Sequence, residues 1–197
     1  MAPPRKHDTD VILDAARDLV LSKGPRAASV AAIAVASGAP VGTLYHRFTS
    51  RDGLLSAVWT RALQRFQITA LAAARAHEDP LERGAALARS SIEFADACPD
   101  DARLLIAVRR DDLLDAAPDG ALGLRLAEMN EPLRAEIRAI ALGLFGRADA
   151  RSVAAVSRAV VDLPYSVVRR YATASKLPAW LASDVAADAR LLLQPHR

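Results

Sequence analysis

The sequence predicts an all-α protein, on the basis of its composition and the spacing of its apolar residues. Among 197 residues there are only 9 glycines and 11 prolines, and aromatic side chains make up 5%. Alanine, leucine and arginine, all good helix formers, dominate. Apolar side chains recur every three to four residues through most of the chain, which indicates amphipathic helices. An all-β fold would need more β-branched, aromatic and turn residues, so the composition argues against it. The apolar-periodic segments described below number nine, so we expect about nine helices.

Length and composition also exclude several classes of protein. A chain of 197 residues with 52% hydrophobic and 25% charged residues is globular, with one large domain or two small ones. The single cysteine, Cys98, excludes an internal disulfide and any CxxC metal cluster. No apolar run approaches the ~20 residues of a membrane helix, and the N-terminus has no hydrophobic signal core. We therefore expect a cytoplasmic protein with no metal.

The first predicted helix begins near residue 9. Asp8 or Thr9 is its N-cap, and acidic side chains in its first turn complement the helix dipole. Gly24 and Pro25 end it. The helix presents one apolar stripe, made of Val11, Ile12, Ala15, Ala16, Leu19 and Val20.

Two short helices follow, over residues 30–36 and 41–48, joined by a turn that contains Gly38. Ser29 can cap the first of them, Gly38 suits a left-handed C-terminal position, and Pro40 suits the first turn of the second. Thr49-Ser50 then caps a long helix over 51–75. The inward side chains of the short pair are expected to be Val30, Ile33 and Ala34, then Leu44 and Phe48. Those of the long helix are Leu54, Leu55, Val58, Trp59, Ala62, Leu63 and Phe66.

The excess positive charge lies in the first third of the chain. Residues 1–66 hold nine basic and five acidic groups, a net +4, whereas the remainder holds 17 basic and 18 acidic groups, a net −1. Between residues 27 and 65 the single acid is Asp52. This distribution fits either ordinary solvated surface or a basic face for phosphates.

Two short helices around a glycine-containing turn, braced by longer helices, match the helix-turn-helix pattern of DNA-binding proteins. In that pattern the second short helix enters the major groove, and neighbouring helix N-termini present N–H groups and hydroxyls to phosphates. Segments 29–34, 37–48 and 50–55 have the residue types and spacing of one family. Over about residues 9–58 the sequence resembles the DNA-binding domain of the TetR/AcrR family of bacterial repressors.

The resemblance implies roles for particular residues. Thr43 would contact the DNA backbone or a base, and Ser29, Tyr45, His46 and Arg51 would contact phosphates. Pro40, Val41 and Gly42 match positions that approach base edges. The sequence departs here from many relatives, which have serine at the position of Pro40 and a lysine, arginine or glutamine at that of Val41. Since Val41 cannot donate a hydrogen bond, specificity would depend on Thr43, Arg47 and DNA shape.

Alternatives remain for two of these side chains and for two basic residues that precede the first helix. The ring of Tyr45 can belong to the core with its hydroxyl exposed, and Arg47 can be a solvated surface residue rather than a base contact. Arg5 and Lys6 can form a flexible arm that reaches a groove or can be an ordinary basic terminus.

The remaining two-thirds is expected to be helical over 81–97, 100–115, 122–145, 150–174 and 179–193, with Pro164 kinking or breaking the fourth of these segments. The expected domains are 1–50, which reads DNA, and 51–197, which binds an effector and dimerises, with the helix at 51–75 as connector. The resemblance implies that 150–174 and 179–193 pair with a second copy, through Val153, Val156, Val160, Val167, Trp180, Leu181, Val185 and Leu192. Intramolecular core is the alternative for the same residues.

The resemblance also implies a ligand pocket among the helices of the second domain. Candidate residues are Phe66, Phe94, Cys98, Leu105, Arg109, Met129, Asp162 and Tyr165, each of which can equally be plain core or surface. The expected function is that of a non-enzymatic regulator, most simply a repressor. It would bind a palindromic operator as a homodimer, associate with the bacterial nucleoid when bound to DNA, and be released by a small-molecule effector.

Two other readings are open. The chain contains no P-loop, dinucleotide fingerprint, HExxH or GxSxG motif, and its four histidines are scattered, so an enzyme would have to lack every recognisable catalytic motif. A helical protein-interaction adaptor is the second alternative, against which the acid-poor stretch at 27–65 argues. No cofactor is expected.

Overall fold

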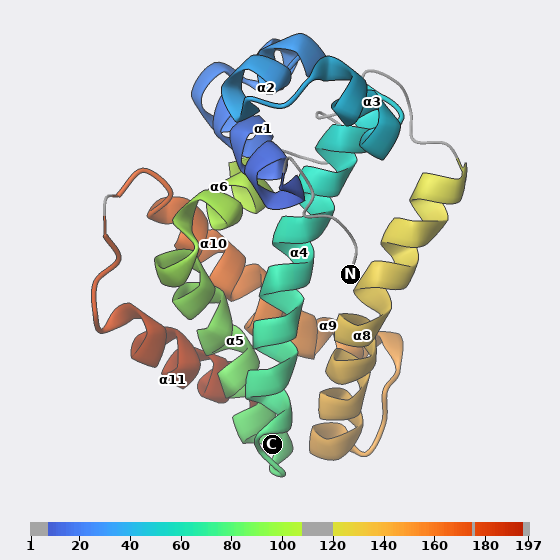
Figure 1. The fold of residues 1–197 in the computed structure, drawn as a ribbon. Helices are drawn as coiled ribbons and strands as arrows, with labels where there is room; N and C mark the ends of the chain where they lie inside the picture. Colours follow the sequence, from blue (N-terminus) through green and yellow to red (C-terminus); the bar gives the residue numbers. More distant parts are fainter. Residues whose placement is uncertain (1–7, 108–119, 175, 195–197) are drawn as a thin grey trace, which may run out of the picture. The chain divides into compact units, whose positions relative to one another are not determined.

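The computed structural model describes residues 8–107, 120–174 and 176–194, without the side chains of 120–127. All of its regular elements within these ranges are helical (Figure 1), which confirms the all-α prediction. The helices are α1 (Thr9–Lys23), η1 (Pro25–Ala27, a 3-10 turn), α2 (Val30–Ser37), α3 (Val41–Phe48), α4 (Arg51–Arg75), α5 (Pro80–Ala97), α6 (Pro99–Ala107), α8 (Gly120–Phe145), α9 (Ala150–Ser157), η2 (Arg158–Asp162, a π-helical turn), α10 (Leu163–Arg170) and α11 (Leu181–Leu193).

Side-chain caps set the starts of several helices. Asp8 caps α1 by accepting a hydrogen bond from the backbone N–H of Asp10 at 3.0 Å, which settles the choice between Asp8 and Thr9. Asp79 caps α5 in the same way, and Asp149 caps α9 through the N–H of Ser152 at 2.8 Å. That bond lowers the pKa of the Asp149 carboxyl below its ordinary value.

Pro164 neither breaks nor ends its helix. The run from α9 through η2 to α10 is continuous over 150–170, and it widens into π-helix directly before the proline. The N–H of Leu163 donates to the carbonyl of Arg158, five residues back. This register shift accommodates the N–H that Pro164 lacks. The predicted break is therefore absent, and a π-bulge stands in its place; the predicted kink stays a prediction.

The chain divides into two compact units, Met1–Leu63 with Asp100–Leu122, and Gln64–Pro99 with Gly123–Arg197. The division falls inside α4 rather than before it, and α6 belongs with the first unit. The core of the first unit joins α1–α4 with one α6 residue: Ile12, Leu13, Ala16, Val20, Ile33, Leu44, Leu54, Leu55, Val58 and Leu104 are among its buried members. In the second unit α5 packs along α11, and Leu87, Ile140, Val156, Val160 and Leu193 are among the buried members.

One expectation about the first helix is wrong in detail. Val11 is 51% exposed, whereas Leu13 is 5% exposed and takes its place in the core. Both residues lie at the edge of the apolar stripe, where a helical period alone does not decide which side faces inward. Val30, Ile33 and Ala34 of α2 are buried, as predicted.

Ion pairs tie helices together within each unit. In the first, Arg17 of α1 reaches Asp101 of α6 at 2.8 Å, and the Asp101 side chain is only 2% exposed. In the second, Glu82 of α5 pairs with Arg190 of α11, and buried Glu136 of α8 pairs with Arg83 at 2.5 Å.

Within the ranges that the structure covers, no helix combines the length and the apolar character needed to cross a bilayer.

Candidate nucleic-acid interface

Capping and turn residues that are recognisable in the sequence form the turn between α2 and α3. The Ser29 hydroxyl oxygen accepts a hydrogen bond from the N–H of Ala32 at 3.1 Å and so caps α2, as predicted. Gly38 ends α2 with a φ of 68°, in the left-handed region that favours glycine. Pro40 is the residue that precedes α3, one position earlier than expected. The two helices are thus joined by only three residues, the geometry of a helix-turn-helix.

Helix α3 buries one side and presents the other. Leu44 is 1% exposed and anchors the helix on the core of the first unit, with Phe48 packed partly against the same core. The predicted DNA contacts divide by exposure. Those that are exposed are Ser29, Pro40, Val41, Gly42, Tyr45 and His46. Those that are half-buried are Thr43, Arg47 and Arg51.

The ring of Tyr45 is not a core element. Tyr45 is 52% exposed, so the alternative in which its ring is buried and only its hydroxyl reaches solvent is wrong. Tyr45 lies one residue after Leu44, and a helical step of 100° turns it away from the core. An exposed aromatic ring with a hydroxyl on a recognition helix can both stack and donate to a phosphate.

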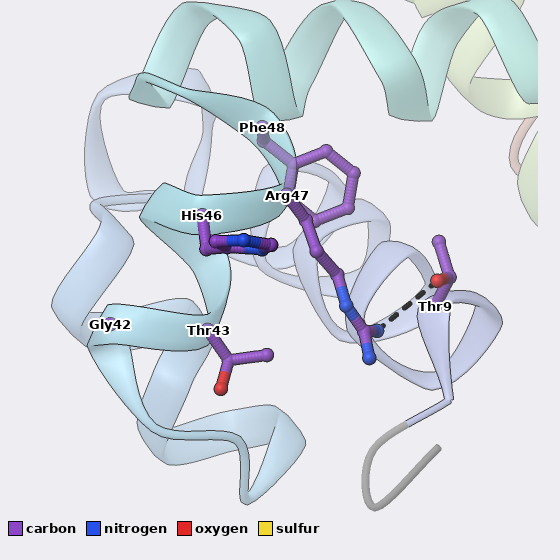
Figure 2. A pocket seen from close by; sticks show the side chains of 6 residues that line it. All are labelled: Thr9, Gly42, Thr43, His46, Arg47 and Phe48. Atoms are coloured by element: carbon purple, nitrogen blue, oxygen red, sulfur yellow. Dashed lines mark hydrogen bonds between the residues drawn. The ribbon is translucent and has the colours of Figure 1, made fainter. Parts of the chain in front are cut away.

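A hollow of about 670 Å³ lies beside α3 (Figure 2). Its lining comes from α3 and from the first residue of α1, and consists of Thr9, Gly42, Thr43, His46, Arg47 and Phe48. The guanidinium of Arg47 extends across it, and Nη1 donates a hydrogen bond of 3.1 Å to Oγ1 of Thr9. Among the described lining residues there are hydroxyls, an imidazole and a guanidinium but no acidic side chain, so the chemistry of the hollow suits an anion or a base edge.

Arg51 makes hydrogen bonds to backbone carbonyls that could not be predicted from its position in the sequence. The side chain is 17% exposed, Nη2 donates to the carbonyl of Pro25 at 2.6 Å, and Nε donates to that of Ala28 at 3.2 Å. Arg51 thereby ties the start of α4 to the segment before α2. The phosphate contact expected of it stays a prediction, and it would have to coexist with these two bonds.

The acids of α1 are neutralised by arginines within the first unit. Arg61 of α4 pairs with Asp10 at 2.8 Å and Asp14 at 2.5 Å. Burial works against the charge of Arg17, but the hydrogen bond and charge of Asp101 outweigh it, with help from Asp18 and Asp14. The pKa of the Arg17 guanidinium therefore lies above its ordinary value. Helices α2 and α3 contain no acidic residue, and α3 contributes His46 and Arg47.

The expected ligand-pocket residues are only partly brought together. Phe66 and Phe94 meet edge to face with ring centroids 5.5 Å apart. Phe94 and Cys98 help to line a hollow of about 420 Å³ in the second unit. Sequence reasoning did not select the other lining residues, which are Arg65, Ile68, Thr69, Glu93 and Ala97.

The other pocket candidates lie elsewhere. Leu105 packs against the core of the first unit, so it does not join Phe94 and Cys98. Asp162 and Tyr165 are exposed and do not line the hollow, because the widened turn η2 and the start of α10 carry them on the outer surface. Met129 is half-buried, and Arg109 lies outside the described residues, as do Arg5 and Lys6. In the described residues no cluster of histidine, cysteine and acidic side chains is arranged to hold a metal ion.

Half of the expected dimer surface is core within the chain. Val156, Val160, Leu181 and Val185 are at most 5% exposed, so they cannot supply surface to a second copy. Val160 lies in η2, and Leu181 and Val185 lie in α11, and α5 packs against both elements. Val156 lies in α9 and belongs to the same core cluster as Ile140 and Leu193. Val153 and Val167 are half-buried, whereas Trp180 and Leu192 are 54% and 50% exposed.

These features define a helix-turn-helix protein with a second, helical unit, and three comparisons agree. Residues 12–58 match the family model described as bacterial regulatory proteins, tetR family. A stretch of 63 residues is 41% identical to the HTH-type transcriptional repressor ComR of Escherichia coli (strain K12), and covers 32% of this chain but only 30% of that protein. The N-terminal segment of the chain is therefore similar to that of the tetR family of bacterial regulatory proteins.

Solved structures extend the likeness of fold to nearly the whole chain. The fatty acid degradation regulator FadR from Bacillus halodurans is 20% identical, with a TM-score of 0.73, over 96% of this chain and 100% of that one. FadR from Bacillus subtilis in complex with stearoyl-CoA is 14% identical, with the same TM-score and coverage. A tetR-family regulatory protein from Rhodococcus RHA1 is 16% identical, with a TM-score of 0.76 over 96% and 98%. Identities this low show a shared fold.

Proposed function

We propose that the chain represses transcription by binding a palindromic operator as a homodimer. The observation that carries this proposal is the outer face of α3, which presents Val41, Gly42, Tyr45 and His46 beside a hollow whose described lining residues include no acid. A surface of this kind suits the major groove and its flanking phosphates. Repression rather than activation is favoured by the similarity to ComR, which is described as a repressor.

Dimerisation follows from the size of the reading surface. Helix α3 has 8 residues, about two turns, and so reaches only a few base pairs. Two copies related by a two-fold axis read two half-sites and so multiply affinity and specificity. Trp180 and Leu192, which are exposed and apolar, are the described residues from the expected interface that remain available to a second copy.

The test is selection of bound duplexes from a random pool. We expect an enriched palindrome whose half-sites are about one helical turn or more apart. Affinity for it should fall steeply with salt concentration, because phosphate contacts release counterions. A pool that yields no enriched sequence would contradict the regulator proposal, and enrichment of a single unrepeated site would contradict the dimer.

Release by a small molecule is the second half of the proposal. The dimer would have one conformation in which its two α3 helices are spaced to fit the operator and another in which they are not. A ligand that binds the second conformation more tightly lowers operator affinity, by an amount set by the difference between its affinities for the two conformations. The apolar hollow bordered by Phe94 and Cys98 is within the usual size of ligand sites. Stearoyl-CoA, which accompanies FadR of Bacillus subtilis, is the first probe to try. If it binds and leaves operator affinity unchanged, long-chain acyl-CoA is excluded as the effector.

A further inference from the structure

The bond between Arg47 and Thr9 joins two helices that both border the proposed DNA surface. Arg47 lies in the last turn of α3, Thr9 is the first residue of α1, and 38 positions separate them in sequence. Figure 2 shows the arginine side chain lying across the hollow with its guanidinium at the threonine hydroxyl. The bond therefore sets the direction of a cationic side chain at the edge of the reading helix.

Thr9 is well suited to hold a flexible partner. Its β-branched side chain has few rotamers, and the Asp8 cap fixes the backbone of the turn in which it lies. Arginine has about four rotatable bonds, and ordering such a side chain on binding costs about 0.5–1.5 kcal/mol. A guanidinium whose plane is already oriented by one hydrogen bond loses less conformational freedom when it meets an oxygen acceptor.

We propose that Thr9 is a positioning residue, which holds Arg47 so that its guanidinium binds a DNA phosphate rather than a base edge. This inference rests on the proposed function in that it requires α3 to lie against DNA. The position of Arg47 favours phosphate, because residues at the N-terminal end of a recognition helix contact bases and Arg47 lies at the other end. The bond to Thr9 also directs the guanidinium away from the α3 axis toward α1 (Figure 2).

The test compares two changes at Thr9 that differ in one functional group. Thr9→Val removes the hydroxyl acceptor and keeps the shape, whereas Thr9→Ser keeps the hydroxyl. Thr173→Val is the matched control, because Thr173 is an exposed threonine of the second unit that does not line the hollow beside Phe94. Dissociation constants are measured for the selected operator and for a random duplex at several salt concentrations, and thermal midpoints report folding.

We expect Thr9→Val to weaken binding about two- to tenfold on both duplexes, the range that corresponds to ordering one long side chain. Thr9→Ser, which keeps the hydroxyl, should recover most of the affinity that Thr9→Val loses, and Thr173→Val should bind as the wild type does. All three should keep the wild-type thermal midpoint. Arg47→Ala should lower the slope of log K against log salt by about one, the loss of one phosphate contact. The double variant Thr9→Val/Arg47→Ala should bind no more weakly than Arg47→Ala alone, because Thr9 acts through Arg47.

Three outcomes would overturn the proposal. A Thr9→Val protein that binds as tightly as the wild type removes the positioning role. A further loss in the double variant shows that Thr9 acts on DNA by itself. A changed ranking of operator sequences in Arg47→Ala shows a base contact. The random duplex reports the same phosphate contact as the operator. If no operator can be selected, the regulator proposal is therefore contradicted, and the role of Thr9 is still tested by the affinities for the random duplex.

Discussion

Two glycines of the first unit lack a side chain for different reasons. A Cβ on Gly53 would lie 2.1 Å from the carbonyl oxygen of Phe48, so the end of α3 can approach the first turn of α4 only if residue 53 is glycine. A Cβ on Gly42 would meet nothing within 4 Å. Glycine in a helix costs up to about 1 kcal/mol relative to alanine. The fold gains nothing from Gly42, which is consistent with close approach of another molecule to α3.

Gly42→Ala should therefore separate stability from binding. We expect the thermal midpoint to rise by about 2–4 °C for a gain near 1 kcal/mol in a chain of this size. Operator affinity should fall at the same time, because the added methyl group holds α3 away from the DNA. Thermal melting and a binding titration measure the two effects, with Ala36→Gly on the exposed side of α2 as a control that changes stability in the opposite direction. Unchanged or tighter binding would show that α3 does not approach DNA at residue 42.

Arg51→Ala should be a stability variant even without DNA. The two hydrogen bonds to the carbonyls of Pro25 and Ala28 are lost, and bonds from a charged group to a half-buried acceptor each contribute about 1.5–3 kcal/mol. Allowing for partial solvent access, we expect a loss of about 2 kcal/mol in urea unfolding. Arg51→Lys should recover only part, because an ammonium cannot span both carbonyls as a guanidinium does. A wild-type unfolding midpoint combined with weaker DNA binding would instead assign Arg51 to phosphate alone.

At the level of single residues, sequence reasoning predicted surfaces better than partners. The outer face of α3 follows from a helical period and one buried anchor, Leu44, so Val41, Gly42 and His46 could be assigned to it. Tertiary partners could not be predicted in this way. Nothing near Arg47 or Arg51 in the sequence indicates Thr9, Pro25 or Ala28, because those contacts depend on how separate helices pack.

At the level of elements, helix borders were predictable because polar caps, glycines and prolines mark them. Asp79, Asp149 and Gly38 act at the ends where their residue types predict them. Pro164 shows where such signals are incomplete. A proline marks a missing N–H, but whether the helix breaks, kinks or widens depends on what packs around it. Here Ala159 and Val160 of η2 and Pro164 of α10 are all buried, and the π-bulge lies between α9 and α10 without breaking the run.

The α5–α11 pair gives a prediction about pH. The carboxylate of Glu82 accepts bonds of 2.8 and 2.6 Å from Arg190, and these bonds hold the pKa of Glu82 below its ordinary value. A carboxyl with a lower pKa in the folded state takes up a proton less readily there than in the unfolded chain. The ion pair therefore stabilises the fold above a pH of about 4.3, and this contribution is lost as pH falls through the lower folded-state pKa of Glu82. Glu82→Gln should therefore cost about 0.5–1 kcal/mol at pH 7 and progressively less in acid.

Urea unfolding of Glu82→Gln at several pH values between 7 and 3 measures this effect. Glu78→Gln, an exposed glutamate in the loop before α5, serves as the matched control and should show no such pattern. A stability difference for Glu82→Gln that stays constant across this range would mean that packing, and not the charge of the carboxylate, holds the two helices together.

At the level of the whole molecule, the valines at 156, 160 and 185 show the limit of periodicity. A stripe of apolar residues predicts that a helix face is buried, but it does not indicate whether the same chain or a second chain packs on that face. Here all three valines are buried within the chain itself, and the expected dimer surface is reduced to side chains such as Trp180 and Leu192.

Trp180→Glu and Leu192→Glu should consequently yield monomers. A charge placed on an apolar contact is not compensated when a second copy covers it, so association is disfavoured. We expect light scattering after size-exclusion chromatography to show the monomer mass, with operator affinity lowered more than about tenfold. Leu142→Glu, at a leucine of α8 that is 56% exposed, is the control and should stay dimeric. Dimers that survive both substitutions would place the interface on other residues.

The first unit is discontinuous in sequence, which has a consequence for its synthesis. Leu104 completes its core, and the Asp101 carboxylate balances Arg17, yet both residues are translated some forty positions after Leu63 closes the rest of the unit. A nascent chain that ends before α6 would have Arg17 without its most buried counter-ion and a core that lacks one leucine. The helix-turn-helix unit would then reach its full stability only after the ribosome has passed α6.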